Sequence, residues 1–468
     1  MVSVVLTIPF VVIVRAFGEF DVLAFVFHAQ FGIDGTTLAG FEYEVLEAVV
    51  AVLALALIGV GLGSIWQLQR LAAILASAVV LALNPAVRFA EEYLGAEAID
   101  SNLHSEIRQP VIATVAETLP DIIVVYMEGL ERIYADRDRY GDIYAPLERY
   151  AVGGVAFTQI KQVKATGWSL AGIVASQCGL PLLPNGFRNK YRFHEQVDFM
   201  SEQTCLSDVT HALGYNNAFV FGGEQVFGGM NHLFRSHEYH RVVDVHSIAD
   251  LVPATDFEAS RLTDFLDMQF ILDDAVVFDA AVSVHDQLLS EQMPFLLTVE
   301  TFGPHGSSSV LSRNCTSSGR AQATGNVTAA ISCTLTDMAP FLNHVARHRN
   351  GRPAIVVLLS DHLNHDVALS VRVPRNARSN TVILFPIGGA TPPVPSGTTI
   401  LRPGSMMDVY PSILAYAGLT ELDGRGGLGV SLFGEEETLL EMKGMEQLNA
   451  ELFPNVALAR SIWAVGTQ

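Results

Sequence analysis

The sequence predicts an α/β domain with a doubly wound, mostly parallel sheet, preceded by an N-terminal helical membrane anchor. Two observations lead to this prediction. From residue 120 onwards, short β-branched runs alternate with segments of helical length, which is typical of strands buried between two layers of helices. Before residue 100, long runs carry no charged side chain, as membrane-spanning helices require.

The composition narrows the class of protein. Half of the 468 residues are hydrophobic, which provides material for a large core and for membrane segments. The net charge is −21, from 28 Lys+Arg against 49 Asp+Glu. Binding to nucleic acid is excluded as a role, because neutralising phosphates requires clusters of lysine and arginine.

Residues 1–100 are predicted to form a membrane anchor with two to three transmembrane helices. The uncharged run 48–66 approaches the roughly 20 residues that a spanning helix needs. Residues 71–87 form a second uncharged run, and residues 2–14 a shorter apolar one. A cleavable signal peptide is the alternative for the short run, and buried helices of a soluble core are the alternative for the other two.

The charges around these runs predict the orientation of the anchor. Arg70 lies in the short link between the two long runs, whereas the loop before them is acidic. Since basic residues favour the cytoplasmic side, the link faces inward and the chain after Arg88 faces outward. We expect a connector at 101–119, a catalytic domain at 120–441 and a C-terminal tail at 442–468.

The domain shows the strand and helix segments that its fold class requires. The predicted strands are residues 121–127, 217–221, 294–299, 354–359 and 381–386. The predicted helices include residues 205–213, 261–289 and 329–348, and a loop rich in Gly and Pro covers 388–403.

Polar side chains follow three of these strands, where open α/β sheets bind their ligands. Glu128 follows the first strand, and Asp361 and His362 follow the strand at 354–359. Glu300 follows the strand at 294–299, and His305 comes a turn later. Carboxylates and imidazoles suit Mn²⁺, Zn²⁺ or Mg²⁺. Glu128, Asp361 and His362 are therefore predicted to hold one divalent metal ion.

Each of these residues also has a structural interpretation. An Asp-His pair after a strand is often only a turn. Glu128 could start a helix or form an ion pair with Arg132. Convergence of all three ligands is what would distinguish a metal site from these alternatives.

The stretch KATGWSLAGIVASQCG, residues 164–179, contains the candidate nucleophile. A small turn precedes a helix that is expected to begin near Ser169. The free N–H groups and the dipole of a helix N-terminus hold phosphate and ease deprotonation of a hydroxyl. Thr166 or Ser169 is a nucleophile in this interpretation, and only a helix cap in the alternative one.

Several motifs together resemble one enzyme family. They are PDIIVVYMEGLE, KATGWSLAGIVASQCGLPL, CLSDV, FGGEQVFGGMNHLFRSHEY, SDH, RPGSMMDVYPSILAYAGL and GRGGLGVSLFG. This arrangement resembles the bacterial phosphoglycerol transferase I family over residues 17–435, including the loop FGEFDVLAFVFHAQFGIDG. That family is related to lipoteichoic acid synthases and phosphoethanolamine transferases in the alkaline phosphatase–sulfatase superfamily.

The resemblance implies roles for the candidate residues. Glu128, Asp361 and His362 would bind one divalent metal, with Mn²⁺ favoured over Zn²⁺ or Mg²⁺. Ser169 would be the nucleophile, at a position where the family usually carries threonine, and Thr166 is the fallback. A serine hydroxyl offers similar chemistry, so the change need not abolish activity.

The resemblance also implies a substrate pocket. The segment 222–237 would line the site for the lipid head group, with Glu224, Asn231 and Arg235 as candidate contacts. A lysine expected from the family is absent around residues 230–232.

A second departure concerns the strand end. The expected motif D-T-H-G-P reads Glu300-Thr301-Phe302-Gly303-Pro304 here. A histidine that would contact the transferring phosphate is therefore replaced by Phe302, and His305 is a candidate substitute. With Glu300, it is assigned to substrate binding.

The four cysteines fit a domain that faces an oxidising compartment. Of three possible pairings, we favour Cys178 with Cys205 and Cys315 with Cys333, which are near in sequence. Free, buried thiols are the alternative.

The predicted function is metal-dependent transfer of phosphoglycerol from phosphatidylglycerol to a periplasmic glucan or similar sugar, through a covalent phospho-Ser/Thr intermediate. The predicted location is the bacterial inner membrane, with the catalytic domain in the periplasm. One alternative is a phosphoethanolamine transferase, phosphodiesterase or sulfatase-like hydrolase of the same superfamily. The other, suggested by Phe302 and the altered pocket, is a non-catalytic protein that binds glucan or lipid.

Overall fold

The structure is a computed structural model that describes residues 101–113, 118–184, 198–263, 270–366, 372–453 and 455–463, together with Leu23, Phe27, Val50 and Leu369. The predicted anchor at 1–100 therefore lies outside the described residues, apart from Leu23, Phe27 and Val50. Among the helices that are described, none is both long enough and apolar enough to cross a membrane.

A nine-stranded sheet forms the centre of the domain, in the order β12-β2-β11-β10-β1-β7-β3-β4, with β13 also paired to β2. Its strands are β1 Asp121–Tyr126, β2 Val155–Lys161, β3 Asn216–Phe221, β4 Arg241–Val243, β7 Phe295–Glu300, β10 Ala354–Leu359, β11 Asn380–Ile387, β12 Thr398–Ile400 and β13 Gly404–Ser405. Three two-stranded ribbons accompany it: β5 Arg261–Thr263 with β6 Phe270–Leu272, β8 Val310–Leu311 with β9 Gln322–Ala323, and β14 Arg425–Gly426 with β15 Gly429–Val430.

The apolar runs become strands because both faces of the sheet are covered. In β1, Ile122 and Val124 enter one core cluster, while Ile123 and Val125 enter the other. Side chains alternate between the two faces of a strand, so a strand buried on both sides must be apolar throughout. The β-branched texture of the sequence reflects this double burial.

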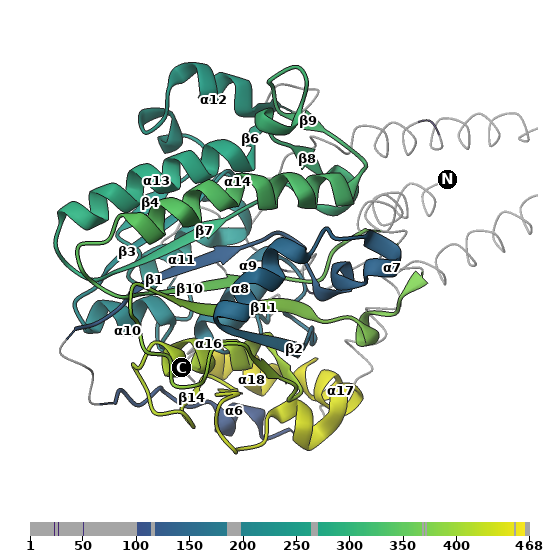
Figure 1. Cartoon of the computed structure of the whole chain (residues 1–468). Helices are drawn as coiled ribbons and strands as arrows, with labels where there is room; N and C mark the ends of the chain where they lie inside the picture. The colour runs from purple at the N-terminus through teal and green to yellow at the C-terminus, as the bar shows by residue number, and fades with distance from the viewer. Residues whose placement is uncertain are drawn as a thin grey trace, which may run out of the picture.

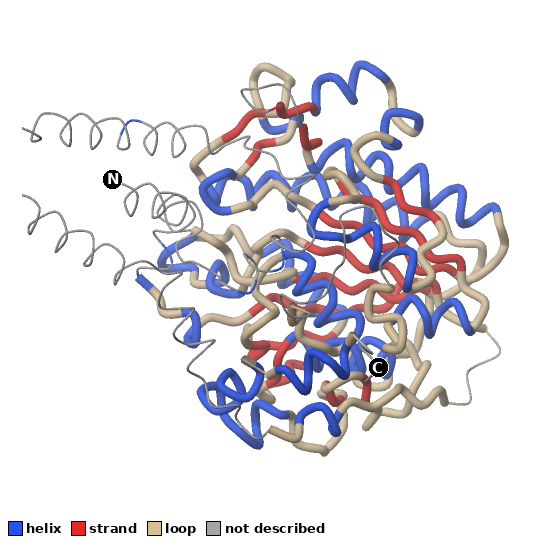
Figure 2. The backbone as a smooth tube through the Cα atoms, turned by 180° about the vertical axis from the view of Figure 1, so that it is seen from behind, coloured by secondary structure: helices blue, strands red, loops and turns tan. Residues whose placement is uncertain are grey.

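Helices pack on both faces of the sheet (Figure 1). The helices are α6 Leu103–Glu106, α7 Arg137–Tyr140, α8 Ala145–Gly153, α9 Ser169–Cys178, α10 Leu206–Ala212, α11 Met230–Ser236, α12 Ala254–Ser260, α13 Asp274–Ser290, α14 Val327–Arg347, α16 Met406–Tyr416, α17 Leu439–Leu452 and α18 Val456–Ile462. Apolar side chains of α13 and α14 share one core cluster, and those of α9 and α16 share the other. Viewed from behind, the strands form one twisted layer between these helices (Figure 2).

Strand direction decides where the functional residues emerge. β10, β1, β7, β3 and β4 pair in parallel, so their carboxyl ends lie at the same edge of the sheet. β11 runs antiparallel to both β10 and β2. The α/β class and the mostly parallel sheet agree with the prediction, although an apolar run alone does not indicate the direction of a strand such as β11.

The prediction of a single helix over 261–289 is wrong for its first residues. Residues 261–263 form β5 and residues 270–272 form β6, and α13 begins only at Asp274. The preceding Asp273 caps the helix, because its side chain accepts a hydrogen bond from the backbone N–H of Val276 at 2.9 Å.

The C-terminal segment contributes to the same core as the sheet. The predicted tail at 442–468 contains most of α17 and all of α18. Leu448, Leu458 and Ile462 are fully buried against the face that carries α9. The described part of this segment is therefore packed on the domain.

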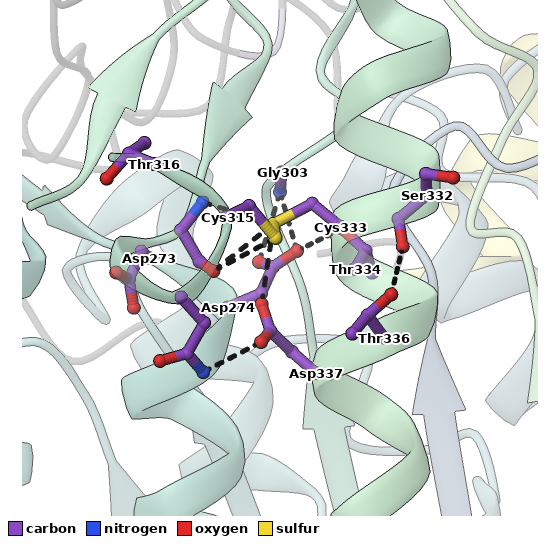
Figure 3. The surroundings of a disulfide bond; sticks show 12 residues. Asp273, Asp274, Gly303, Cys315, Thr316, Ser332, Cys333, Thr334, Thr336 and Asp337 are labelled. Carbon is purple, nitrogen blue, oxygen red and sulfur yellow. Dashed lines mark hydrogen bonds between the residues drawn. A yellow bond between two sulfur atoms is a disulfide. The ribbon is translucent and has the colours of Figure 1, made fainter. Parts of the chain in front are cut away.

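Two disulfides join neighbouring elements of the domain. Cys178 at the end of α9 is bonded to Cys205 at the start of α10, and Cys315 is bonded to Cys333 on α14. This is the pairing favoured from the sequence. Figure 3 shows the second disulfide beside Asp274 and Gly303, which belongs to the loop after β7.

Shortening a side chain in the central strand β10 should destabilise the domain. Leu358 is fully buried, so Leu358→Ala removes apolar contacts and leaves a cavity, at a cost of about 2–5 kcal/mol. Leu401, which is 69% exposed, provides the matched control. Urea unfolding should show the loss for Leu358→Ala and little change for Leu401→Ala; equal stabilities would contradict the placement of β10.

Candidate active site

The register of the parallel strands brings three loops to one place. Tyr126 of β1 lies beside Leu359 of β10 on one side and beside Glu300 of β7 on the other. The residues that follow these strands therefore emerge side by side. Glu128 and Asp361 are two residues beyond the paired positions, and both are buried.

Glu128, Asp361 and His362 converge on one point. The Nε2 atom of His362 lies 3.0 Å from Oε1 of Glu128 and 3.1 Å from Oδ2 of Asp361. His362 Nδ1 lies 2.8 Å from the carbonyl oxygen of Leu363 and must donate to it, because a carbonyl can only accept. With Nδ1 directed at this carbonyl, Nε2 is the atom that faces the two carboxylates, and it is the atom that would coordinate a metal ion. Despite its burial, the charges of Asp361 and Glu128 raise the pKa of His362 well above its ordinary value.

This arrangement fits a divalent metal ion. Within the described part of the chain, Glu128 Oε1 and Asp361 Oδ2 are buried and have no neighbour able to donate a hydrogen bond beyond Nε2 of His362. Buried carboxylates are unfavourable unless a positive charge lies beside them. Two ligands bound about 2.1 Å from an ion at a right angle are about 3.0 Å apart, which matches the spacing observed here.

The electrostatics of the site also call for a cation. Burial, together with the negative charge of Asp361, raises the pKa of Glu128 to about 7. Burial and the charges of Asp361 and Glu128 raise the pKa of Glu300 well above its ordinary value. Burial opposes the ionisation of Asp361 as well, but the neighbouring His362 lowers the pKa of this carboxyl group. The strand ends thus gather three buried carboxyl groups, and two of them, Glu128 and Glu300, are disfavoured as anions.

Ser169 is positioned against this cluster. It is the first residue of α9, and its hydroxyl donates to Oε2 of Glu128 at 3.3 Å. The chain enters the helix through a tight turn in which Ala165 adopts a left-handed φ of 64°. Strained backbone of this kind often occurs where a functional group has to be presented in a fixed direction.

Thr166, the fallback nucleophile, is not brought to the cluster. Its side chain is fully buried, and its hydroxyl donates to the carbonyl of Val163 at 2.8 Å. The N-cap position of α9 belongs to Trp168, and Ser169 follows it. Of the two hydroxyls, only that of Ser169 contacts a member of the cluster.

Helix α9 is fitted closely against the loop that carries Asp361. A Cβ atom added at Gly172 would lie 1.9 Å from the carbonyl oxygen of Asp361. A glycine is therefore required for this approach, which sets the distance between the helix that begins at Ser169 and the cluster.

His305 also reaches the cluster. Its Nε2 atom lies 4.0 Å from Oε1 of Glu128, and its Nδ1 atom lies 2.7 Å from the hydroxyl of Ser308. The imidazole stacks on the ring of Phe302, with 4.7 Å between centroids and 8° between planes. Burial, reinforced by nearby His362, lowers the pKa of His305 to about 4, so the ring is neutral.

The head-group candidates lie on the segment that contains α11. Glu224 is 3.9 Å from His246, and Arg235 contacts the ring of His232 on its own helix at 2.9 Å. Neither contact reaches the cluster, and Asn231 lies on the first turn of α11. Phe227 of the same segment meets the ring of Trp168 edge-on at 6.2 Å, which brings the segment beside the residue before Ser169.

A buried network that the sequence did not indicate holds the loop after β10. Glu131 and Arg378 form a fully buried ion pair. Glu131 also accepts from the backbone N–H of Asn364, and the amide of Asn364 donates to the carbonyls of Gly129 and Pro304. The three strand-end loops are thereby tied together.

Asp274 holds the loop after β7 from the other side. Its carboxylate accepts the backbone N–H groups of Phe302 and Gly303, at 2.8 and 3.0 Å, and the hydroxyl of Thr334 on α14. In sequence it is one of two consecutive aspartates inside a predicted helix, so nothing distinguished it from a surface residue.

Comparisons with known proteins agree with this geometry. The model of the family described as Sulfatase matches residues 120–419, which include the whole cluster and Ser169. Phosphoglycerol transferase I of Xanthomonas euvesicatoria pv. vesicatoria (strain 85-10) is 27% identical over 350 residues, covering 73% of this chain and 47% of that protein. Phosphoglycerol transferase I of Citrobacter koseri is 26% identical over 425 residues, covering 87% and 53%. The chain thus spans about half the length of the curated relatives it matches.

A solved structure shows the same fold. A protein in the alkaline phosphatase superfamily from Vibrio parahaemolyticus superposes with a TM-score of 0.51 at 16% identity, covering 69% of this chain and 72% of that chain. The family resemblance read from the motifs is confirmed, and metal binding by the named residues stays a prediction.

Replacing Gly172 should displace the candidate nucleophile. In Gly172→Ala the new methyl group would overlap the carbonyl of Asp361, so α9 or the loop must move. A displacement of about 1 Å in an active site can cost on the order of 100-fold in rate. Gly153→Ala is the matched control, since nothing lies within 4 Å of its added Cβ. Equal phosphotransfer rates for both variants would show that the close approach is unimportant.

Removing a carboxylate of the cluster should weaken metal binding. Asp361→Asn replaces a charged ligand with a neutral amide, so affinity for Mn²⁺ should fall at least about tenfold. Equilibrium dialysis against Mn²⁺ measures this change. Asp250→Asn alters an exposed aspartate and should retain wild-type affinity; the same retention in Asp361→Asn would exclude the cluster as the binding site.

Proposed function

Because the chain belongs to the sulfatase family, we propose that it is a metal-dependent transferase that moves a phosphoglycerol group from phosphatidylglycerol to a sugar hydroxyl. The observation that carries this proposal is the Ser169 hydroxyl held against the cluster of Glu128, Asp361 and His362. The similarity to proteins named phosphoglycerol transferase I supports phosphoglycerol as the transferred group. A periplasmic glucan is the proposed acceptor.

Glu128, Asp361 and His362 would hold the divalent ion, for which we favour Mn²⁺. Such an ion would lower the pKa of a coordinated hydroxyl and neutralise charge on a phosphoryl oxygen. The protein's own contribution is orientation. The loops tied by Asn364 fix the ligands, and the packing of Gly172 fixes the helix that begins with Ser169.

In the first step, the Ser169 oxygen attacks the phosphorus of phosphatidylglycerol. A new bond forms between that oxygen and phosphorus, and the bond from phosphorus to the diacylglycerol oxygen breaks. The proton lost by Ser169 is balanced by the proton that diacylglycerol gains as it leaves. The product on the protein is a glycerophospho-serine.

In the second step, a sugar hydroxyl attacks the same phosphorus. The bond from phosphorus to Ser169 breaks, the serine regains a proton, and the acceptor loses one. The neutral imidazole of His305, which reaches Glu128, is positioned to contact the transferring group, and it substitutes for the histidine that the family motif would place at Phe302. Hydrogen bonding from such a ring would stabilise charge that develops on phosphate oxygens.

The donor lipid also bears on location. Phosphatidylglycerol stays in the bilayer, so an anchored enzyme would meet it at a high effective concentration. We propose the bacterial inner membrane, with the catalytic domain on the periplasmic side. The two disulfides support an oxidising compartment.

Replacing Ser169 tests the proposal directly. The full chain in detergent is incubated with phosphatidylglycerol labelled in the head-group glycerol, and the intact protein is analysed by mass spectrometry. Wild type should gain a glycerophosphate adduct, and Ser169→Ala should gain none because the attacking oxygen is gone. Thr166→Ala should still be labelled.

Three outcomes would overturn the assignment. Labelling that persists in Ser169→Ala but disappears in Thr166→Ala would move the nucleophile. Labelling from phosphatidylethanolamine in place of phosphatidylglycerol would change the transferred group. Unlabelled protein that still binds Mn²⁺ and lipid would favour a binding role over catalysis.

A further inference from the structure

We propose that His211, Glu238 and His240 form a second site for a divalent transition-metal ion such as Zn²⁺, independent of the active site. His211 lies on the last turn of α10, and the other two residues lie between α11 and β4. Their three candidate ligand atoms all lie within 4.8 Å of one another.

The distances fit ligands of a tetrahedral ion better than they fit direct hydrogen bonds. The Nε2 atoms of His211 and His240 lie 3.7 and 3.4 Å from the same oxygen, Oε2 of Glu238. Hydrogen bonds from nitrogen to oxygen are about 2.7–3.2 Å long. Two ligands that each bind zinc at about 2.0–2.1 Å with a tetrahedral angle are about 3.4 Å apart.

The tautomer of His240 supports the same conclusion. Its Nδ1 atom lies 2.8 Å from the backbone carbonyl of Glu238, and only a protonated Nδ1 can donate to that oxygen. In the neutral ring, Nε2 then carries a lone pair that faces the carboxylate. That lone pair is available to a metal ion shared with the carboxylate, and an N–H···O=C contact of this kind is typical of metal-binding histidines.

The two imidazole rings also lie close together. Those of His211 and His240 stack with 4.8 Å between centroids and 29° between planes. One metal ion could therefore be shared by the two rings.

The backbone presents these side chains in a fixed way. Glu238 adopts a left-handed φ of 57°, an uncommon conformation for a residue other than glycine. Its carbonyl also accepts from the side chain of buried Asn217 at 3.0 Å. Between the two ligands, Tyr239 is buried and its hydroxyl donates to Gln177 at 2.7 Å, which anchors the loop in the core.

The site lies where the parallel strands begin, whereas the active site lies where they end. A pocket of about 220 Å³ beside it is lined by His211 and His240, together with Asn216, Arg241 and Glu291. Asn216 begins β3, whereas the active-site loops follow the ends of the parallel strands. Water in this pocket would complete the coordination, and the ion would brace the end of α10 against the edge strand β4.

Zinc binding to the full chain tests the proposal. The protein is saturated with Mn²⁺, Zn²⁺ is added, and the zinc retained per chain and the unfolding temperature are measured. His211→Ala and His240→Ala should each lower zinc affinity at least about tenfold and remove the zinc-dependent rise in unfolding temperature. Phosphotransfer should be unchanged, because neither residue touches the active-site cluster.

Two comparisons make the result decisive. His104→Ala removes an exposed histidine elsewhere on the domain and should bind zinc like wild type. His344→Ala alters a different His-Asp group, formed with His285 and Asp286. Zinc retention that is unaffected by the His211 and His240 substitutions, or that is lost only in His344→Ala, would overturn the proposal.

Discussion

The central constraint on this protein is the convergence of two buried carboxylates and an imidazole on one point. Two carboxylates so close together are unfavourable in a protein interior unless a positive charge lies beside them. Much of the surrounding structure serves to hold this cluster together. The loops after three strands are held by Asn364, by Asp274 and by the ion pair of Glu131 with Arg378. These contacts keep the two carboxylates together despite their mutual repulsion.

The sequence predicted correctly those elements whose residue pattern reflects their place in the fold. β1 and β10 were recognisable because both of their faces are buried, and Glu128, Asp361 and His362 were found because parallel strands end at a common edge. It ranked Ser169 above Thr166 only through the family resemblance, because the local pattern does not show where a turn points each hydroxyl. Nor could it find Glu131 with Arg378, since partners separated by 247 positions leave no local signal.

The exchange at Phe302 has a physical interpretation. Phe302 stands where the family motif would place a histidine, and its ring stacks on the imidazole of His305. The Nε2 atom of His305 lies 4.0 Å from Oε1 of Glu128. An aromatic surface of this kind restricts the orientation of its neighbour. The loop after β7 thus brings an imidazole near the cluster from three residues further along the chain.

Phe27 shows how the N-terminal part of the chain is connected to the domain. It is completely buried among Trp168, Phe199 and Trp463, and Trp168 immediately precedes Ser169. A truncated protein that starts near residue 100 would lack this ring. It would carry an apolar hole next to Ser169, where detergent or lipid chains could enter. Its behaviour would then differ from that of the full chain for a reason unrelated to membrane attachment.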